Sequence, residues 1–249
     1  MSAAELAKEE TALEIGPGKG ILTQRLLGRV KRLVAVEIDR SLAEALPRQL
    51  AGSSSVRIVA GEVLKQDLDA LFSVNDYPVK LLGNLPYAIT APIFEKILAW
   101  PRWRTGVFLV QKEVAERMRS KEGSRVYGVL SLAVQLFATV EIILAVPPSA
   151  FRPPPEVHSC VIRVRRKAQA ELPPEATPSF FDLVRGAFAH RRKTIANSLA
   201  LHSSVDKKIL EKWLAEQAVL PSARAENISL NEYVRLAPAW RIFRRETGI

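Results

Sequence analysis

The stretch Ala12-Leu13-Glu14-Ile15-Gly16-Pro17-Gly18-Lys19-Gly20-Ile21-Leu22-Thr23 decides the fold of this chain. It is typical of a short buried strand, a glycine-rich turn and the start of a helix, which is how an α/β sheet opens a nucleotide site. A second apolar run, 33–36, ends in Glu37. An acid about 20 residues after the first glycine is placed to accept hydrogen bonds from ribose hydroxyls.

Two familiar nucleotide motifs do not fit this turn. The dinucleotide fingerprint needs a third glycine three places after the second, where this chain has Ile21. A P-loop needs Lys followed by Ser or Thr, and here Lys19 is followed by glycine. A glycine turn with a ribose acid but no pyrophosphate fingerprint fits S-adenosylmethionine best. We therefore expect Gly16, Gly18 and Glu37 to bind this cofactor.

The tetrad Asn84-Leu85-Pro86-Tyr87 follows another apolar run, 79–83. The exocyclic amine of adenine is conjugated with its ring and is a poor nucleophile, so acceptors must hold its hydrogens and an aromatic face must hold the base. Asn84 and a backbone carbonyl supply acceptors, because Pro86 fixes its own φ and biases Leu85 toward an extended shape. Tyr87 supplies a stacking face. The alternative is a plain strand-terminal turn.

Strand-like runs alternate with helical ones in the first part of the chain. This order predicts a mostly parallel sheet covered on both faces, with ligands at the carboxyl ends of the strands. Two final strands are joined only by the Pro-rich loop 147–156, so we expect them to pair as a hairpin. The expected strands are 12–15, 33–36, 56–59, 79–82, 107–110, 140–146 and 159–164.

A change in composition over 165–178 indicates a linker, and the pattern after it predicts helices. We place the boundary between a first domain, 1–166, and a helical domain, 167–249. One apolar stripe predicts a single helical face that carries the basic segment Arg191-Arg192-Lys193. These cations are candidate contacts for RNA phosphates, with a solvated helix face as the alternative. The stripe consists of Phe181, Val184, Phe188, Ile195 and Leu199.

Composition limits the class of partner. The formal net charge is +10 and the isoelectric point about 9.9, as expected of a protein that meets a phosphate backbone. One cysteine, Cys160, excludes an internal disulfide and suits a reducing cytosol. No run is long and apolar enough to span a membrane, and 1–10 is unlike a signal peptide. The histidines lie in no metal-like spacing with Cys160, so we expect no metal site.

Several further motifs complete a pattern that runs from about residue 10 to about residue 236. On these motifs the chain resembles the ribosomal RNA small-subunit adenine N(6),N(6)-dimethyltransferase family. The motifs are Leu13-Glu14-Ile15-Gly16-Pro17-Gly18, Val36-Glu37-Ile38-Asp39, Gly83-Asn84-Leu85-Pro86-Tyr87, Val110-Gln111-Lys112-Glu113-Val114-Ala115, Tyr127-Gly128-Val129-Leu130-Ser131, Pro147-Pro148-Ser149-Ala150-Phe151-Arg152-Pro153-Pro154-Pro155-Glu156-Val157-His158-Ser159, Arg191-Arg192-Lys193-Thr194 and Arg224-Ala225-Glu226-Asn227-Ile228-Ser229.

The resemblance implies a Rossmann-like class I S-adenosylmethionine-dependent methyltransferase sheet with a C-terminal helical domain. It implies dimethylation of two adjacent adenosines near the 3′ end of small-subunit ribosomal RNA, within an assembling subunit, by a cytoplasmic monomer that needs no membrane. It adds Phe151 as the second wall of the base pocket, opposite Tyr87. It also adds Ile38, Glu62, Val63 and Asn84 to the residues that bind the cofactor.

This sequence departs from the family pattern at two places. Family members usually begin with an arm containing Gly-Gln-Asn-Phe-Leu, which closes over the cofactor, and no such stretch precedes Ala12. Because the arm closes over the cofactor in the family, full cofactor affinity and catalytic closure do not follow from the resemblance. The third strand usually ends in Gly-Asp-Ala, whereas here it reads Gly61-Glu62-Val63. Glu62 keeps the carboxylate that meets the adenine amine but adds a methylene.

Two other functions stay open at this point. Related resistance methyltransferases modify large-subunit RNA and share an Asn-Pro-Tyr style tetrad, but they typically lack the 147–159 pattern. A non-catalytic ribosome-assembly or nucleic-acid-binding protein on the same fold is the second alternative.

Overall fold

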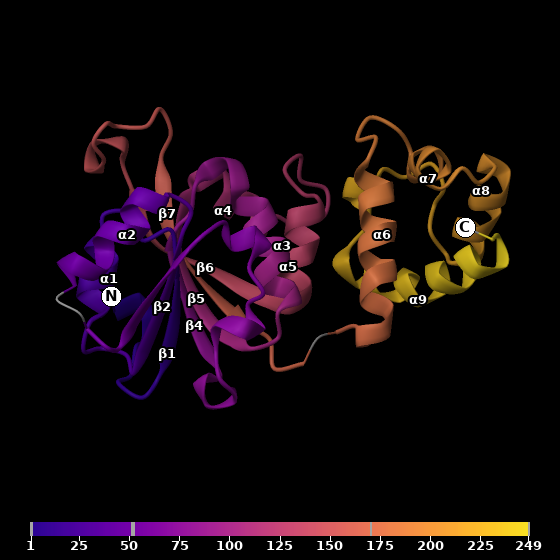
Figure 1. Cartoon of the computed structure of the whole chain (residues 1–249). Helices are drawn as coiled ribbons and strands as arrows, with labels where there is room; N and C mark the ends of the chain where they lie inside the picture. Colours follow the sequence, from indigo (N-terminus) through magenta and orange to yellow (C-terminus); the bar gives the residue numbers. More distant parts are fainter. Residues whose placement is uncertain (1, 51–52, 170, 249) are drawn as a thin grey trace. The chain divides into compact units, whose positions relative to one another are not determined.

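A seven-stranded sheet forms the centre of the first part of the chain (Figure 1). The computed structural model describes residues 2–50, 53–169 and 171–248, with only the backbone described at Ser2 and Tyr87. The strand order is β3-β2-β1-β4-β5-β7-β6, and each of the seven expected strands is present. Their bounds are β1 Thr11–Ile15, β2 Arg32–Glu37, β3 Val56–Ala60, β4 Val79–Asn84, β5 Trp103–Gln111, β6 Ala138–Val146 and β7 Ser159–Arg166.

The register of the sheet brings several strand ends to one edge. Strands β1 to β5 pair in parallel, and Ile15 at the end of β1 lies opposite both Val36 of β2 and Gly83 of β4. β7 is antiparallel to both β5 and β6, which confirms the expected hairpin. The segments that follow β1, β2, β3 and β4 therefore leave the sheet on the same side, where ligands bind in open α/β sheets.

Short helices connect the parallel strands. Gly20 precedes the first of them with φ 78°, and a Cβ at this position would lie 2.5 Å from Leu46 Cδ2. Asp39 caps the second, because its side chain accepts a hydrogen bond of 3.1 Å from Leu42 N. These connections include α1 Ile21–Leu26, α2 Arg40–Gln49 and α3 Thr90–Ala99, with 3-10 turns η2 Val63–Lys65 and η5 Tyr87–Ile89. Helix α4 Lys112–Arg119 follows β5, and the 3-10 turn η6 Pro148–Ala150 lies in the loop between β6 and β7.

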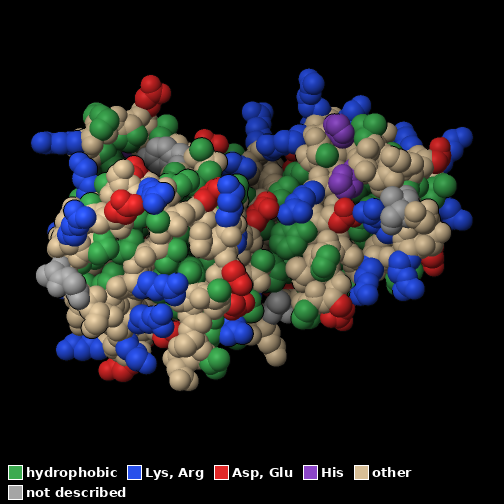
Figure 2. Space-filling model, in the orientation of Figure 1, with side chains coloured by type: hydrophobic (Ala, Val, Ile, Leu, Met, Phe, Trp, Pro, Cys, Tyr) green, Lys and Arg blue, Asp and Glu red, His purple; other side chains and the backbone are tan. Residues whose placement is uncertain are grey.

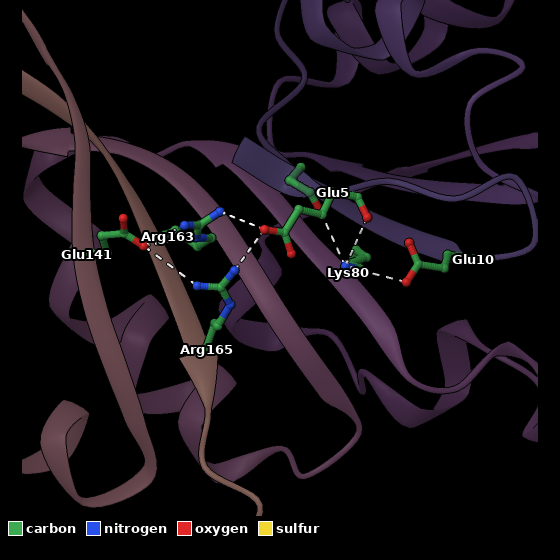
Figure 3. A network of polar contacts seen from close by, with 7 residues as sticks. Glu5, Glu10, Lys80, Glu141, Arg163 and Arg165 are labelled. Atoms are coloured by element: carbon green, nitrogen blue, oxygen red, sulfur yellow. Dashed lines mark hydrogen bonds and ion pairs between the residues drawn. The ribbon is translucent and has the colours of Figure 1, made fainter. Parts of the chain in front are cut away.

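A buried lysine anchors the N-terminal segment to the sheet (Figure 3). Lys80, the second residue of β4, is 7% exposed. Its ammonium donates to the backbone carbonyls of Ala4 and Glu5 at 3.3 Å each and lies 3.4 Å from the Glu10 carboxylate. The charge is thus paired and hydrogen-bonded, as a buried ammonium must be.

The same segment reaches the antiparallel strands through ion pairs. The Glu5 carboxylate accepts from Arg163 at 2.9 Å and from Arg165 at 2.8 Å, both on β7. Glu141 on β6 pairs with Arg163 at 2.6 Å (Figure 3). The network therefore links the N-terminal segment with β4, β6 and β7.

The contacts divide the chain into two units. The first contains 1–115 and 138–166, and the second contains 116–137 and 167–249. Residues 116–137 thus group with the helical unit. The boundary predicted from the sequence, between residues 166 and 167, places them in the first domain. The reason for this grouping is aromatic packing across distant positions, since the rings of Phe137 and Phe181 stack at 6.2 Å and those of Tyr127 and Phe188 meet at 6.1 Å.

The apolar stripe from Phe181 to Leu199 belongs to two helices, α6 and α7, and not to the one helix that the sequence predicted. Residues 189–194 form a turn, and Thr194 begins the next helix by accepting from Asn197 N at 3.4 Å. The prediction of a basic helix was therefore wrong, and Arg191-Arg192-Lys193 lies in the turn. No described helix is long and apolar enough to cross a membrane. The helices are α5 Val129–Phe137, α6 Thr177–Phe188, α7 Ile195–Ser203, α8 Lys207–Glu216 and α9 Leu230–Glu246.

Asp182 on α6 links three of these helices. Its carboxylate accepts from Trp240 Nε1 at 2.8 Å and from Arg244 at 2.5 Å, both on α9, and lies 3.1 Å from His202 Nε2 on α7. Burial by itself would raise the pKa of Asp182, but the hydrogen bonds from Arg244, Trp240 and His202 outweigh it and hold the pKa below its usual value.

We expect Asp182→Ala to lower the free energy of unfolding by about 2–3 kcal/mol at neutral pH, because three partners lose a charged acceptor. The deficit should shrink as the pH falls through the lowered pKa of Asp182, since the wild-type carboxylate is then protonated as well. Chemical denaturation at several pH values measures both effects. Glu211→Ala removes a partly exposed carboxylate from α8 as the control. An equal loss in the two variants would contradict the linking role.

Candidate functional site

The glycine turn after β1 presents backbone where a ligand can approach. Gly16 has φ +69° and Gly18 φ +56°, a region that favours glycine. A Cβ added at Gly16 would lie 3.7 Å from the Asn84 carbonyl oxygen, whereas one at Gly18 would meet nothing within 4 Å. The turn after β1 and the end of β4 therefore lie side by side, and the backbone at Gly18 has an open face.

Glu37 connects the glycine turn to the end of β2. One of its carboxylate oxygens accepts from Gly18 N at 2.8 Å, and the other accepts from Asp39 N at 2.9 Å. The residue is 5% exposed. A carboxylate oxygen has two acceptor positions, so each keeps one for a ribose hydroxyl. Glu37 thus fits the predicted ribose contact and also holds the turn in place.

A mostly apolar pocket lies beside this carboxylate at the carboxyl edge of the sheet. Ile38 is 67% exposed, which is unusual for a large apolar side chain and suits the face of a flat ring. Of the predicted cofactor residues, Gly16, Ile38, Glu62 and Val63 line this pocket together. The complete lining is Ile15, Gly16, Val36, Ile38, Gly61, Glu62, Val63, Pro86 and Ile89.

Glu62 shares its carboxylate with a neighbouring lysine. Its Oε2 lies 2.8 Å from Lys65 Nζ, within the turn that follows β3. Gly61 precedes it with φ +148°, so the chain bends sharply at the strand end. The second carboxylate oxygen is left for a ligand amine. The ion pair with Lys65 was not predicted, because the sequence does not show which partner an exposed lysine selects.

The tetrad forms a fixed bend at the end of β4. Asn84 is exposed, whereas Leu85 is buried and donates its N–H to Leu109 O at 3.1 Å. The carbonyl of Pro86 accepts from Ile89 N at 3.2 Å and from the Thr90 hydroxyl at 3.0 Å. The segment is therefore a strand-terminal turn, and it also leaves the Asn84 side chain accessible. The side chain of Tyr87 lies outside the part of the chain that the structure describes.

Phe151 lies on the loop between β6 and β7. Its N–H donates to Pro148 O at 3.1 Å, and its side chain is half-buried, so part of the ring stays accessible. The loop rejoins the sheet where His158 O accepts from Lys112 N at 2.9 Å. This is at the carboxyl end of β5, the strand next to the one that carries Asn84.

Glu14 in β1 is a buried acid that was not predicted as a site residue from the sequence. It is 1% exposed, and its Oε2 has no hydrogen-bond partner among the described residues. Burial raises the pKa of Glu14 to about 7; the nearby charge of Glu37 adds to the rise, and Thr23 offsets part of it. The sequence feature that could have indicated this buried acid is its place inside the apolar run Ala12-Leu13-Glu14-Ile15. Ile89 had no comparable signal, because it follows the tetrad in an irregular turn.

The geometry of this edge fits an S-adenosylmethionine cofactor. Glu37 retains free acceptor positions, exposed Ile38 and buried Val63 give the edge apolar surface, and the backbone at Gly18 is open. Fold and site together define an S-adenosylmethionine-dependent methyltransferase of class I.

Comparison with known proteins gives the family. A sequence model of the ribosomal RNA adenine dimethylase family matches residues 1–240, and the chain belongs to this family. The chain is 44% identical over 246 residues to "Ribosomal RNA small subunit methyltransferase A" of Nostoc sp.. The aligned region covers 95% of this chain and 90% of the relative. The protein of the same name in Bacillus mycoides is 38% identical over 243 residues, covering 95% and 83%.

Two solved structures have the same fold over nearly the whole chain. A dimethyladenosine transferase from Plasmodium falciparum gives a TM-score of 0.76 at 25% identity, covering 100% of this chain and 94% of that one. The 23S rRNA methyltransferase ErmE gives 0.66 at 26% identity, covering 96% and 94%. The methyl donor of the family is S-adenosylmethionine, as the motifs predicted.

The buried acid predicts a pH-dependent stability. Because the pKa of Glu14 rises from 4.5 to about 7 on folding, the folded chain binds the extra proton within this window and loses stability as the pH rises through it. Glu14→Gln removes this dependence, so relative to wild type we expect it to gain about 3 kcal/mol between pH 4.5 and pH 8. Urea denaturation without cofactor measures the gain. Exposed Glu9→Gln is the control, and parallel pH profiles for wild type and Glu14→Gln would contradict the assignment.

The ribose contact predicts a loss of cofactor affinity. We expect Glu37→Ala to weaken binding of S-adenosylmethionine by about 1.5–3 kcal/mol, because a charged acceptor is removed. Isothermal titration calorimetry gives the value, and Glu44→Ala, which removes an exposed acid from α2, should bind as wild type does. Unchanged affinity in Glu37→Ala would exclude this carboxylate from the site.

Proposed function

We propose that the chain transfers methyl groups from S-adenosylmethionine to the N6 amines of two adjacent adenosines near the 3′ end of small-subunit ribosomal RNA. The observation that carries this proposal is the close approach of the Asn84 carbonyl to Gly16, which puts the adenine-type tetrad beside the cofactor turn. The names of the relatives support the small subunit as the substrate.

The tetrad has the groups that this chemistry needs. Bound S-adenosylmethionine supplies a methyl group on a positively charged sulfur. Asn84 Oδ1 and the Leu85 carbonyl accept hydrogen bonds from the adenine amine, which favours its tetrahedral, more nucleophilic form. The Pro86 carbonyl is already held by Ile89 and Thr90, so the bend does not need to reorganise when a base enters. Rate enhancement then comes mainly from positioning.

The target base must leave its stack to reach this edge. In the proposal Tyr87 and Phe151 hold the extruded adenine on its two faces. The accessible part of the half-buried Phe151 ring and its place on a Pro-rich loop support this role, because a stiff loop presents a ring at low entropic cost. Gly16, Gly18, Glu37, Ile38, Glu62 and Val63 hold the cofactor, with Asn84 between cofactor and base.

The helical unit supplies contacts with the RNA backbone. Arg191, Arg192 and Lys193 are exposed, and they belong to a chain of net charge +10. In the proposal the substrate is the small subunit during its assembly, and the chain acts as a monomer in the cytoplasm.

Methylation of large-subunit RNA is the second candidate, because the structure of a 23S rRNA methyltransferase also matches with a TM-score of 0.66. The loop pattern in 147–159, which the small-subunit family has, favours the first candidate. The two substrates give different labelled products, so one assay separates them.

With unmethylated small and large subunits offered together, we expect wild type to incorporate labelled methyl from S-adenosylmethionine into small-subunit RNA, giving dimethyladenosine on digestion. Asn84→Ala should abolish incorporation while the variant still binds RNA, since the tetrad acts on the base and the basic residues act on the backbone. Asn75→Ala, which alters an exposed Asn elsewhere, should remain active. Label in large-subunit RNA alone would favour the second candidate, and full turnover by Asn84→Ala would exclude the proposed role.

A further inference from the structure

The turn that follows β3 is fixed by contacts with two other elements. Gly61 N donates to Glu37 O at 2.7 Å, which ties the start of the turn to the end of β2. The ammonium of Lys96 on α3 donates to Leu64 O at 2.9 Å, which ties the middle of the turn to that helix. The backbone that carries Glu62 is therefore held on both sides of this residue.

The carbonyl of Glu62 also accepts two hydrogen bonds from within the turn. Lys65 N donates to it at 3.0 Å, and Gln66 Nε2 donates to it at 3.4 Å. With the backbone held in this way, the position of the Glu62 carboxylate depends on the side-chain torsions. A Glu side chain has one rotatable bond more than an Asp side chain, so fixing its carboxylate at one place costs more conformational entropy.

Lys65 supplies the group that fixes this carboxylate. Its Nζ lies 2.8 Å from Glu62 Oε2, and the hydrogen bond with Glu62, together with the charge of that acid, raises the pKa of Lys65 above its usual value. The Lys65 side chain is 81% exposed and that of Glu62 only 29%, so the lysine reaches the carboxylate from the solvent. The pair engages Oε2, which leaves the acceptor positions of Oε1.

The carboxylate lies at the pocket that is predicted to hold the cofactor. Glu62 lines this pocket together with Ile38 and Val63, two further residues predicted to bind S-adenosylmethionine. A carboxylate that accepts from an exocyclic amine favours adenine over a purine without that amine. The favour is larger when the carboxylate needs less reorganisation before it meets the amine. An ion pair that holds Glu62 in advance reduces this reorganisation.

We propose that Lys65 is a positioning residue for the cofactor, which holds the Glu62 carboxylate where it accepts a hydrogen bond from the 6-amino group of adenine. The inference rests on the cofactor part of the proposed function, because it takes S-adenosylmethionine to bind along this edge. Lys65 acts through Glu62 and does not need to contact the cofactor itself. In this role it offsets the extra methylene that Glu62 has relative to the Asp usual in the family.

Positive charge alone does not distinguish Lys65. Lys and Arg side chains are spread over the face of both units that Figure 2 shows. Lys212 on α8 is a matched case, since its side chain is also 81% exposed and lies 3.9 Å from an acid, Glu216. It belongs to the unit that contains none of the predicted cofactor residues. Lys212→Ala therefore controls for the loss of an exposed, paired lysine.

The test compares two ligands, S-adenosylhomocysteine and the analogue in which hydrogen replaces the 6-amino group. The ratio of their affinities, measured by isothermal titration calorimetry without RNA, isolates the contribution of the amine. We expect wild type to prefer the amine about tenfold, because the amine donates to a charged acceptor. The preference should fall to about threefold in Lys65→Ala, as suits the loss of an exposed ion pair. It should be retained in Lys65→Arg and in Lys212→Ala, and it should vanish in Glu62→Ala.

An unchanged ratio in Lys65→Ala would overturn the positioning role. An equal loss of affinity for both ligands would also overturn it, because Lys65 would then support the turn and not the amine contact. The melting temperature of Lys65→Ala should match that of wild type, since the side chain is exposed.

The outcome is separable from that of the methylation assay, because no RNA is present. A ratio lowered by Lys65→Ala would support the inference even if small subunits are not methylated, and an unchanged ratio would overturn it even if they are. A wild type without preference for the amine would remove the adenine contact of Glu62, and the inference with it.

Discussion

The arrangement of the site depends on the carboxylate of Glu37. Its two oxygens accept hydrogen bonds from Gly18 N and Asp39 N, so one side chain fixes both the glycine turn after β1 and the chain after β2. Charge-assisted bonds of this kind are stronger than neutral ones. The same oxygens retain positions for ribose hydroxyls. One buried acid thus shapes the turn and keeps acceptor positions at the predicted cofactor edge, which is why we expect its loss to affect binding and not folding alone.

The sheet register brings the rest of the site to this carboxylate. Ile15 lies opposite Val36 and Gly83, so the strands that lead to Glu37 and Asn84 end level with the glycine turn. The carbonyl of Asn84 then comes close to Gly16, where a Cβ would lie 3.7 Å from it, and the φ of +69° is what favours glycine at this position. The purine pocket and the tetrad share Pro86 as a wall. The residues predicted to hold the cofactor and the base therefore lie together because parallel strands end together, not because they are close in sequence.

The sequence predicted the features that depend on local patterns. Apolar runs marked all seven strands, and the glycine turn with Glu37 marked the cofactor edge. The prediction of a continuous helix failed at 189–194, because the apolar spacing from Phe181 to Leu199 continues across a turn. Thr194 ends this turn and caps the next helix. It also could not assign 116–137 to the helical unit, since that depends on ring contacts between distant residues. The strand-end residues that line the pocket could be selected from the sequence, whereas the place of Ile89 in the lining and the Glu62–Lys65 ion pair arise from packing.

The central claim is that the cofactor binds along the carboxyl edge formed by β1 to β4. Hydrogen–deuterium exchange with and without S-adenosylmethionine tests it most directly. We expect added protection in peptides that cover 15–20, 36–39, 61–65 and 84–90, and none in α7 and α8, because the predicted contacts lie only at the first set. Protection confined to the helical unit, or no change at the glycine turn and Glu37 under saturating cofactor, would contradict the account.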